Sequence, residues 1–355
     1  MMSPSTLGPS TLGFSTSVLW AQTLLQGALV FELRSRDAEV LARAERIFSP
    51  YRTGNHLNTP PLRVFEIEPH QDKESAQWVL RSLAWGEEPE PEPQLCATLT
   101  LALANVEFAA VHAAAEYATV ATHAHLAAAQ RAVGLHGALL YRAGKGVLIV
   151  GVHEAGKSTL ACGLWQAGWS LLTDDYALLA AQATHAETEQ TRLNDVPRTD
   201  DLAREVADRV ARPLAHAIAR RVSLRPTSRA LLGEELWQCV LATPASDQLG
   251  DDLAGRTLFH PHQVDGSERL SCVPLHAIVL LQRPEVALEP GETRRLDASR
   301  SLFALLPHCG LSHRAEVGAA LRAFGPLVGQ VPTFDMKRGS LPLMVTNLNR
   351  IMDAL

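Results

Sequence analysis

The chain has 355 residues, of which 46% are hydrophobic and 20% charged. It can therefore bury a sizeable core, and a wholly disordered chain is excluded. The formal net charge of −6 argues against a non-specific nucleic-acid binder, which needs a basic face to neutralise phosphates. The length predicts about two domains.

Cysteine usage and hydropathy indicate the compartment. The five cysteines are scattered and form no CxxC pair, so a disulfide framework or a zinc ribbon is not expected. No basic segment precedes an apolar run at the N-terminus, and no stretch of about 18 residues is apolar throughout. We therefore expect a cytoplasmic protein without a membrane partner.

The first part of the chain alternates between strand and helix patterns. We expect a loose leader over 1–16, which repeats PSTLG, and an acidic, proline-rich loop over 86–94. Strands are predicted over 29–35 and 62–68, with a helix over 36–48 between them and a long alanine-rich helix over 108–133. These patterns predict a smaller α/β N-terminal domain over 17–130, of unknown role.

The remainder, 131–355, reads as a second α/β domain. Apolar strands over 136–142 and 146–150 are joined by a tight turn, and a helix over 158–166 ends at Gly168, which suits a C-cap. A strand over 169–172 completes a βαβ unit. Further on, we predict a helical segment over 196–222, a loop over 244–269, a strand over 275–283 and helices over 313–329 and 341–355.

The strongest motif is GVHEAGKS at 151–158, which fits G-x-x-x-x-G-K-[ST] between an apolar strand and a helix. Glycines let the backbone curl so that its N–H groups face an anion, and the start of the helix adds a positive dipole end. Lysine reaches the β- and γ-phosphates, and the serine hydroxyl suits Mg²⁺. The predicted nucleotide contacts are Gly151, Val152, His153, Glu154, Ala155, Gly156, Lys157, Ser158 and Thr159, with Glu154 expected to point outward.

Two carboxylates, Asp174 and Asp175, follow the strand after this helix. One fits a Mg²⁺-holding role and the other a general base. Neighbouring residues in a strand point to opposite sides, so we expect different tasks for them. The alternative is that the two aspartates form a solvated turn after the strand and have no part in catalysis. His136 opens the strand that pairs with the strand entering the motif, and it could face the phosphate site or be structural. His260 and His262 are read as loop residues and not as metal ligands.

The segment HGALLYRAGKGVLIVGVHEAGKSTLACGLWQAGWSLLTDD, 136–175, resembles the catalytic domain of the HPr serine kinase/phosphorylase family and its related bacterial proteins. The same order of HG, hairpin, phosphate loop, helix, glycine and DD is found in that family. VPLHAIVLLQR at 273–283 and GQVPTFDMKRG at 329–339 resemble its later strands. The resemblance implies the P-loop fold shared with phosphoenolpyruvate carboxykinase, in which a hairpin precedes the loop.

The resemblance also implies roles. Lys157 and the loop amides would bind ATP, and Ser158 would ligate Mg²⁺. Asp175 would act as the base toward an acceptor serine, Asp174 would lie nearer the metal, and His136 would organise the acceptor site. The expected activity is transfer of the γ-phosphoryl group from ATP to a hydroxyl, most simply serine of a protein or peptide, by an enzyme that can form homo-oligomers.

Two features depart from the family pattern. The glycine-containing signature that carries a metal-binding Glu is replaced by NDVPRTDDLARE at 194–205, where Asp201 or Glu205 would have to substitute. The catalytic arginine has no clear counterpart among Arg220, Arg221, Arg225 and Arg229. A nucleotide-binding sensor without turnover therefore stays open as an alternative. An ABC-type ATPase is not favoured, because no LSGGQ-like run occurs.

Overall fold

The computed structural model describes residues 16–24, 27–38, 40–42, 63–69, 77–85, 93–102, 132–152, 155–180, 212–217, 222–224, 226–242, 247–248, 257–266, 270, 272–282, 289–309 and 314–355. The chain divides into two compact units, unit 1 (1–122 with 249–253) and unit 2 (123–248 with 254–355). The domain limits of 17–130 and 131–355 stay a prediction, because residues 103–131, on both sides of the proposed boundary, lie outside the described part.

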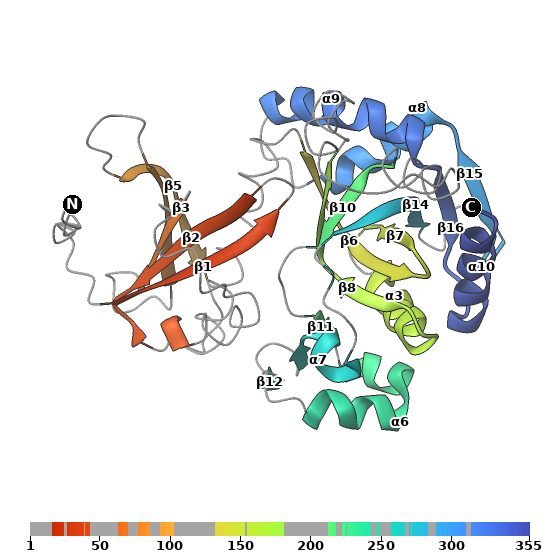
Figure 1. Cartoon of the computed structure of the whole chain (residues 1–355), viewed down its shortest axis with the longest axis horizontal. Coiled ribbons are helices and arrows are strands. Elements are labelled where there is room, and N and C mark those ends of the chain that lie inside the picture. The colour runs from red at the N-terminus through yellow and green to blue at the C-terminus, as the bar shows by residue number, and fades with distance from the viewer. Residues whose placement is uncertain are drawn as a thin grey trace, which may run out of the picture. The chain divides into compact units, whose positions relative to one another are not determined.

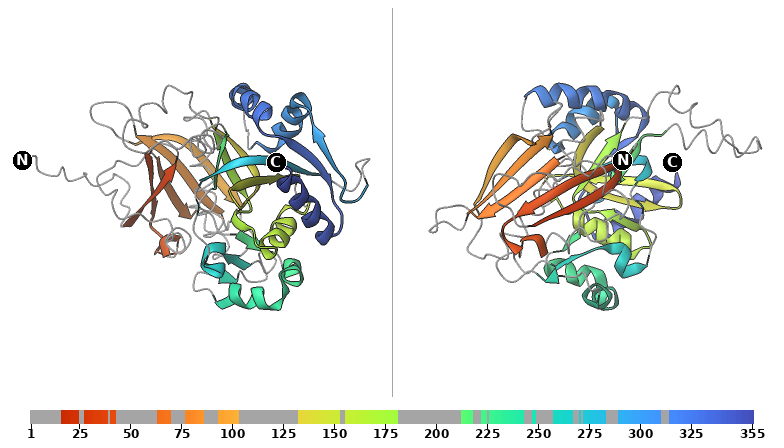
Figure 2. Two further views of the ribbon diagram at one scale, coloured as in Figure 1. Left: turned by 45° about the vertical axis from the view of Figure 1, so that its right-hand side comes forward. Right: turned by 60° about the vertical axis from the view of Figure 1, so that its left-hand side comes forward.

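Unit 1 contains a five-stranded sheet in the order β1-β2-β3-β4-β5 (Figures 1 and 2). Only β2 and β3 are parallel, so the chain must cross over between them. Residues 38 and 40–42 of that connection are helical. They lie within the helix that the sequence predicted over 36–48. The strands are β1 Thr16–Leu24, β2 Gly27–Ser35, β3 Arg63–Pro69, β4 Gln77–Trp85 and β5 Pro93–Ala102.

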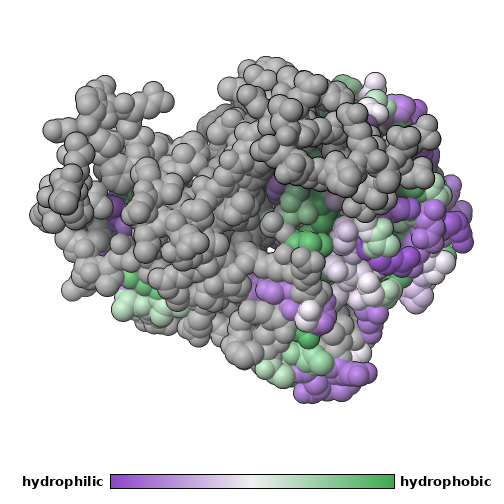
Figure 3. All heavy atoms as spheres, viewed as in Figure 1, coloured by the Kyte–Doolittle hydropathy of each residue, from purple (hydrophilic) through white to green (hydrophobic). Residues whose placement is uncertain are grey.

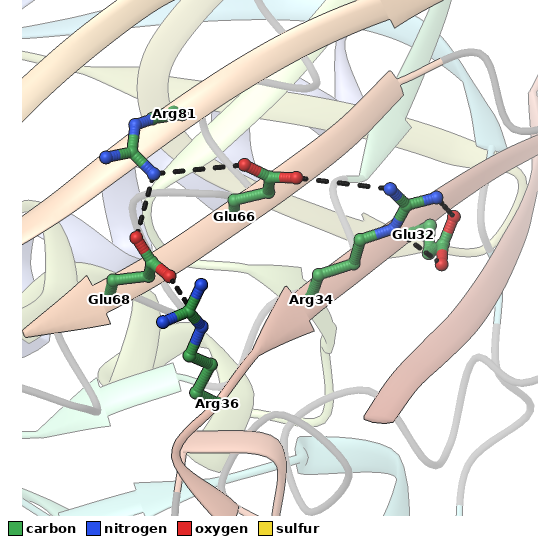
Figure 4. A network of polar contacts seen from close by, with 6 residues as sticks. All are labelled: Glu32, Arg34, Arg36, Glu66, Glu68 and Arg81. Atoms are coloured by element: carbon green, nitrogen blue, oxygen red, sulfur yellow. Dashed lines mark hydrogen bonds and ion pairs between the residues drawn. The ribbon is translucent and has the colours of Figure 1, made fainter. Parts of the chain in front are cut away.

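The two faces of this sheet differ in chemistry. Leu33, Phe65, Ile67 and Leu80 are buried on one face. The other carries a ladder of charges across β2, β3 and β4, shown in Figure 4: Glu32, Arg34, Arg36, Glu66, Glu68 and Arg81. The alternation of side chains along each strand separates the two sets.

Glu66 lies at the centre of the ladder, directly opposite Arg34 on β2 and Arg81 on β4. Each of its ion pairs is 3.9 Å long, whereas Arg34 and Arg81 make closer pairs with Glu32 (2.9 Å) and Glu68 (2.8 Å). Burial raises the pKa of Glu66 because it penalises the charged form, and the two arginines oppose this shift. The arginines therefore limit the cost of a carboxylate that is 3% exposed.

Unit 2 is built on an eight-stranded mixed sheet. Its pairings run β6–β9–β10–β14–β7 and back to β6, so five of its strands form a closed ring. β16 and β15 extend the sheet beyond β14, and β8 pairs with β6. The strands are β6 Ala132–Arg142, β7 Lys145–Val150, β8 Ser170–Thr173, β9 Tyr176–Ala180, β10 Leu214–Ala217, β14 Cys272–Gln282, β15 Thr293–Leu296 and β16 Thr333–Lys337.

Helices cover both faces of this sheet, as Figures 1 and 2 show. Val147 and Ile149 of β7 pack in the core formed with α3 (Lys157–Gln166), α6 (Pro226–Ala242) and α10 (Leu341–Asp353). Leu148 and Val150 point the other way, into the core formed with α8 (Ala298–Leu305) and α9 (Arg314–Gln330). β7 is thus apolar on both sides, as expected of a strand covered on both faces.

Several sequence-based predictions for unit 2 are confirmed. The hairpin of β6 and β7, the helix α3 with Gly168 in the left-handed region (φ 85°), β8, β14, and the closing helices α9 and α10 are all present. Unit 2 is a mixed α/β structure. Hydrophilic side chains predominate around α10 and α6 on the face drawn in Figure 3. In the described part of the chain, no helix is long and apolar enough to span a membrane.

Other predictions were wrong. The helical reading of 196–222 fails at Leu214–Ala217, which is β10, and at Val222, where β11 (Val222–Leu224) begins. There, burial between neighbouring strands outweighs the helix propensity of alanine. The loop predicted over 244–269 contains β12 (Asp247–Gln248), β13 (Thr257–Phe259) and α7 (Pro261–Asp265). The long helix predicted over 108–133 lies outside the described residues except for Ala132 and Val133, which belong to β6.

The buried His216 of β10 makes stability depend on pH. Burial lowers its pKa to about 4 from the ordinary 6.5, and its Nε2 lies 3.5 Å from Cys272 Sγ. Between these two pH values the unfolded chain binds more protons than the folded one, so the free energy of unfolding falls as the pH is lowered. We expect the wild type to lose on the order of 2 kcal/mol more than His216→Gln between pH 7 and pH 4.5. Urea unfolding followed by tryptophan fluorescence measures this, and equal losses in the two proteins would contradict it.

Candidate active site

The loop between β7 and α3 is where the phosphate-binding motif lies. β7 ends at Val150 and α3 begins at Lys157, so the predicted strand–loop–helix arrangement is present. The N–H of Ala155 donates to the Val152 carbonyl at 3.1 Å, which closes a turn inside the loop. His153 and Glu154 lie outside the described residues.

Two positions of the motif require glycine, each for a different structural reason. Gly151 packs against β14, where an added Cβ would lie 2.8 Å from the Leu281 carbonyl oxygen. Gly156 adopts φ 100° and ψ 19°, in the left-handed region that side-chain-bearing residues avoid. The first glycine therefore permits close packing of the loop on the sheet, and the second lets the chain turn into α3.

The start of α3 presents backbone donors. The N–H of Leu160 is the first to find an intrahelical acceptor, Gly156, at 2.9 Å, so those of Lys157, Ser158 and Thr159 precede the intrahelical ladder. No side chain caps this end in the described part of the chain, and the first turn carries no acidic residue. The side chains of Ser158 and Thr159 are half-buried. This geometry favours an anion.

Lys157 brings a buried positive charge to the loop. It is 7% exposed, and its Nζ donates to the carbonyls of Gly151 at 2.8 Å and Val152 at 3.2 Å. Burial lowers the pKa of Lys157, and the negative charge of Asp174 opposes that shift. The lysine is thus held across the loop by neutral carbonyls and lies close enough to Asp174 to interact with its charge.

The aspartate pair directly follows β8, as predicted, but the chain does not leave the sheet after it. The chain continues directly from β8 into β9, and both pair with β6, so Asp174 and Asp175 form an irregularity along one edge of that strand. The Gly137 N–H donates to the Asp175 carbonyl at 2.9 Å. This bond ties the pair to β6 at the end where β7 enters the loop.

The two aspartates have different surroundings, in keeping with the expected division of tasks. Asp174 is 7% exposed and interacts electrostatically with Lys157 and Cys162 of α3. Asp175 is more open, and its Oδ1 lies 3.0 Å from Nδ1 of His136. One carboxylate therefore faces the helix side of the site, and the other forms a pair with a histidine that is 44% exposed.

His136 owes its position to the glycine that follows it. Gly137 pairs with Val150, the last residue of β7, and an added Cβ at Gly137 would lie 2.5 Å from the Ile149 carbonyl oxygen. Only glycine therefore lets β6 run this close to β7. The side chain of His136 consequently lies beside the start of the loop.

His308, which the sequence analysis did not single out, belongs to the same site. It ends the short 3₁₀ helix η3 (Leu306–His308), which contacts β6. Burial lowers the pKa of His308, and the positive charges of Lys157 and His136 lower it further. No motif marks this residue, because it lies far along the chain and only the fold brings it to the loop.

All these groups gather at one edge of the sheet, by which we mean the edge formed by the carboxyl ends of β7, β8, β14 and β16. β14 is parallel to both β7 and β16, and β8 runs in the same direction as β7 because both are antiparallel to β6. The loop follows the carboxyl end of β7, and the aspartate pair follows that of β8. In open α/β sheets and in α/β barrels alike, ligands bind at the carboxyl ends of the parallel strands.

The oxygen donors of the site suit Mg²⁺ delivered with a nucleotide. Nowhere in the described part of the chain do three or more His, Cys, Asp or Glu side chains form a metal cluster. Mg²⁺ bound with phosphates needs only one or two protein ligands, and it prefers oxygen. The Ser158 hydroxyl and the Asp174 carboxylate meet that requirement. Asp201, Glu205, Arg220, Arg221 and Arg225 lie outside the described residues, and Arg229 lies in α6.

Comparison with known proteins adds little to this geometry. No protein-family model matches the chain, and no curated protein sequence matches it. Among solved structures, the Hpr(Ser) kinase/phosphatase from Coxiella burnetii is similar, with 12% sequence identity over 62% of this chain and 99% of that chain. The TM-score is 0.29, so the functional argument below relies on the residues of the site themselves.

The left-handed conformation of Gly156 yields a prediction with a matched control. An alanine Cβ at this position would make ordinary contacts, 3.7 Å from Leu281 Cδ2, so the cost is backbone strain of about 1–2 kcal/mol in the free energy of unfolding. Gly168→Ala, at φ 85° with nothing within 4 Å of its Cβ, should cost the same. Only Gly156→Ala should also weaken Mg-ATP binding, which calorimetry would measure. Equal binding by both variants would contradict a role for this turn.

Proposed function

We propose that the protein is an ATP- and Mg²⁺-dependent kinase of the HPr kinase-like type, which transfers the γ-phosphoryl group to a hydroxyl, serine of a protein or peptide. One observation carries the proposal: a buried lysine at an uncapped helix start shares a sheet edge with a His–Asp pair. The hairpin of β6 and β7 that precedes the loop supports an HPr kinase-like arrangement of unit 2.

The loop and Lys157 would bind the phosphate chain. The N–H groups at the start of α3 point to where an anion is favoured. The Nζ of Lys157 would exchange its bonds to the Gly151 and Val152 carbonyls for phosphate oxygens. Ser158 and Asp174 would hold Mg²⁺, which neutralises phosphate charge and orients the phosphates when bound.

Asp175 would accept the acceptor's proton. In the proposed reaction the hydroxyl oxygen bonds to the γ-phosphorus, the bond from that phosphorus to the β–γ bridging oxygen breaks, and ADP leaves. The hydroxyl proton passes to Asp175, whose carboxylate is oriented by Nδ1 of His136 at 3.0 Å. Since both side chains are partly exposed, an acceptor side chain can reach them from solvent.

Lys157→Ala tests the phosphate site. We expect this variant to lose at least about 10-fold in Mg-ATP affinity by calorimetry, because a charge-assisted contact to phosphate disappears. Lys145→Ala is the matched control. Lys145 begins the same strand, β7, and donates to the Met352 carbonyl at 2.8 Å, so its loss should leave affinity unchanged. A wild type that binds no Mg-ATP would refute the proposal.

Asp175→Asn separates a kinase from a nucleotide sensor. The variant should keep Mg-ATP affinity within about threefold while phosphoryl transfer falls by about 10²–10⁴-fold, the range typical of general-base loss. Transfer is measured as label from γ-labelled ATP on a degenerate serine-containing peptide library. A wild type that binds Mg-ATP but labels no peptide would favour the sensor.

A further inference from the structure

Arg338 lies at the same sheet edge as the phosphate loop. It directly follows β16, whose carboxyl end is next to that of β14, and β14 in turn pairs with β7. Figure 1 shows β7, β14 and β16 within one sheet, in which β14 lies between the other two. The topology therefore brings an arginine from near the end of the chain to the start of α3.

The distance between Arg338 and the loop is short. A Cβ added to Gly156 would lie 3.9 Å from Nε of Arg338. The guanidinium stem is thus in van der Waals range of the residue that precedes Lys157. In the phosphate-loop motif, the backbone amides at this position cradle the α- and β-phosphates.

The guanidinium is available for a ligand. Arg338 is exposed, and within the described ranges it makes no hydrogen bond or ion pair. Asp335, the acidic residue of the preceding strand β16, pairs instead with Arg294 at 3.0 Å. A guanidinium stays charged at all working pH values and matches two phosphate oxygens with parallel N–H groups.

The charge balance at this edge also favours an anion. Lys157, the positive end of α3 and Arg338 meet around Gly156, while Asp174 is the acidic group that interacts with Lys157. An incoming polyphosphate would therefore meet positive groups on both sides of Gly156 and would require no existing ion pair of Arg338 to break.

We propose that Arg338 binds the α- and β-phosphates of the nucleotide held by the loop 151–158, an inference that rests on the proposed nucleotide site. This residue lies outside the set of arginines that the family resemblance suggested. Its place against Gly156 assigns it to the part of the phosphate chain that ATP and ADP share. It is a binding residue for both substrate and product nucleotide.

Calorimetry with Mg-ATP and Mg-ADP on Arg338→Ala tests the assignment. We expect both dissociation constants to rise by about 10-fold, since a bidentate charged contact is lost from both ligands. Arg338→Lys should recover only part of this, because an ammonium cannot form the paired contact. Arg295→Ala is the control, since Arg295 is an exposed arginine on the neighbouring strand β15, opposite Phe334 of β16, and this variant should bind both nucleotides as the wild type does.

The outcomes separate this inference from the proposed function. If the wild type binds neither nucleotide, the nucleotide site itself fails. If the wild type binds and Lys157→Ala does not, but Arg338→Ala binds both nucleotides normally, the assignment of Arg338 is overturned. Weakening of ATP alone would place Arg338 at the γ-phosphate and would also overturn it. Thermal unfolding of each variant verifies that the exposed substitutions leave the fold intact.

Discussion

The site depends on how the ammonium of Lys157 is kept inside the protein. A charge that is more than nine-tenths buried is costly unless it is hydrogen-bonded, and here two loop carbonyls and the charge of Asp174 offset the cost. The atoms that accept the hydrogen bonds of Nζ are carbonyl oxygens and not carboxylate oxygens. The lysine is therefore held in place by these partners, and its ammonium adds to the positive potential at the start of α3.

The strand β6 holds the rest of the site around that charge. It lies between β7 and β8, and its Gly137 lets two backbones approach closely while its N–H fixes Asp175. The register of β6 against β7 then places His136 beside the loop. Because the His–Asp pair and the loop are both tied to β6, a shift of this strand would move acceptor-side and nucleotide-side groups together.

Much of this site could be predicted from the sequence because it is local. The loop, α3 and β8 lie within one short segment, where strand and helix periodicity and glycine positions are sufficient. The continuation from Asp175 into β9 was missed, since nothing local distinguishes a strand end from an irregularity within a strand. His308 and Arg338 were missed for another reason: each reaches the loop through contacts between distant segments, His308 through the contact of η3 with β6 and Arg338 through the pairing of β16 with β14. The helical reading of Leu214–Ala217 failed because pairing with β9 and β14 outweighs alanine's local preference.

The charge ladder of unit 1 has a consequence for how that sheet assembles. Side chains alternate between faces, so sliding β3 by one residue along β2 would bring the carboxylate of Glu66 onto the apolar side with Leu33. Sliding it by two toward the start of β2 would set Glu66 against Glu32, two like charges that are both buried. Both errors are penalised far more heavily than a mismatch of aliphatic side chains. The ladder therefore specifies the register of β3 against β2 more strictly than the apolar face could do by itself.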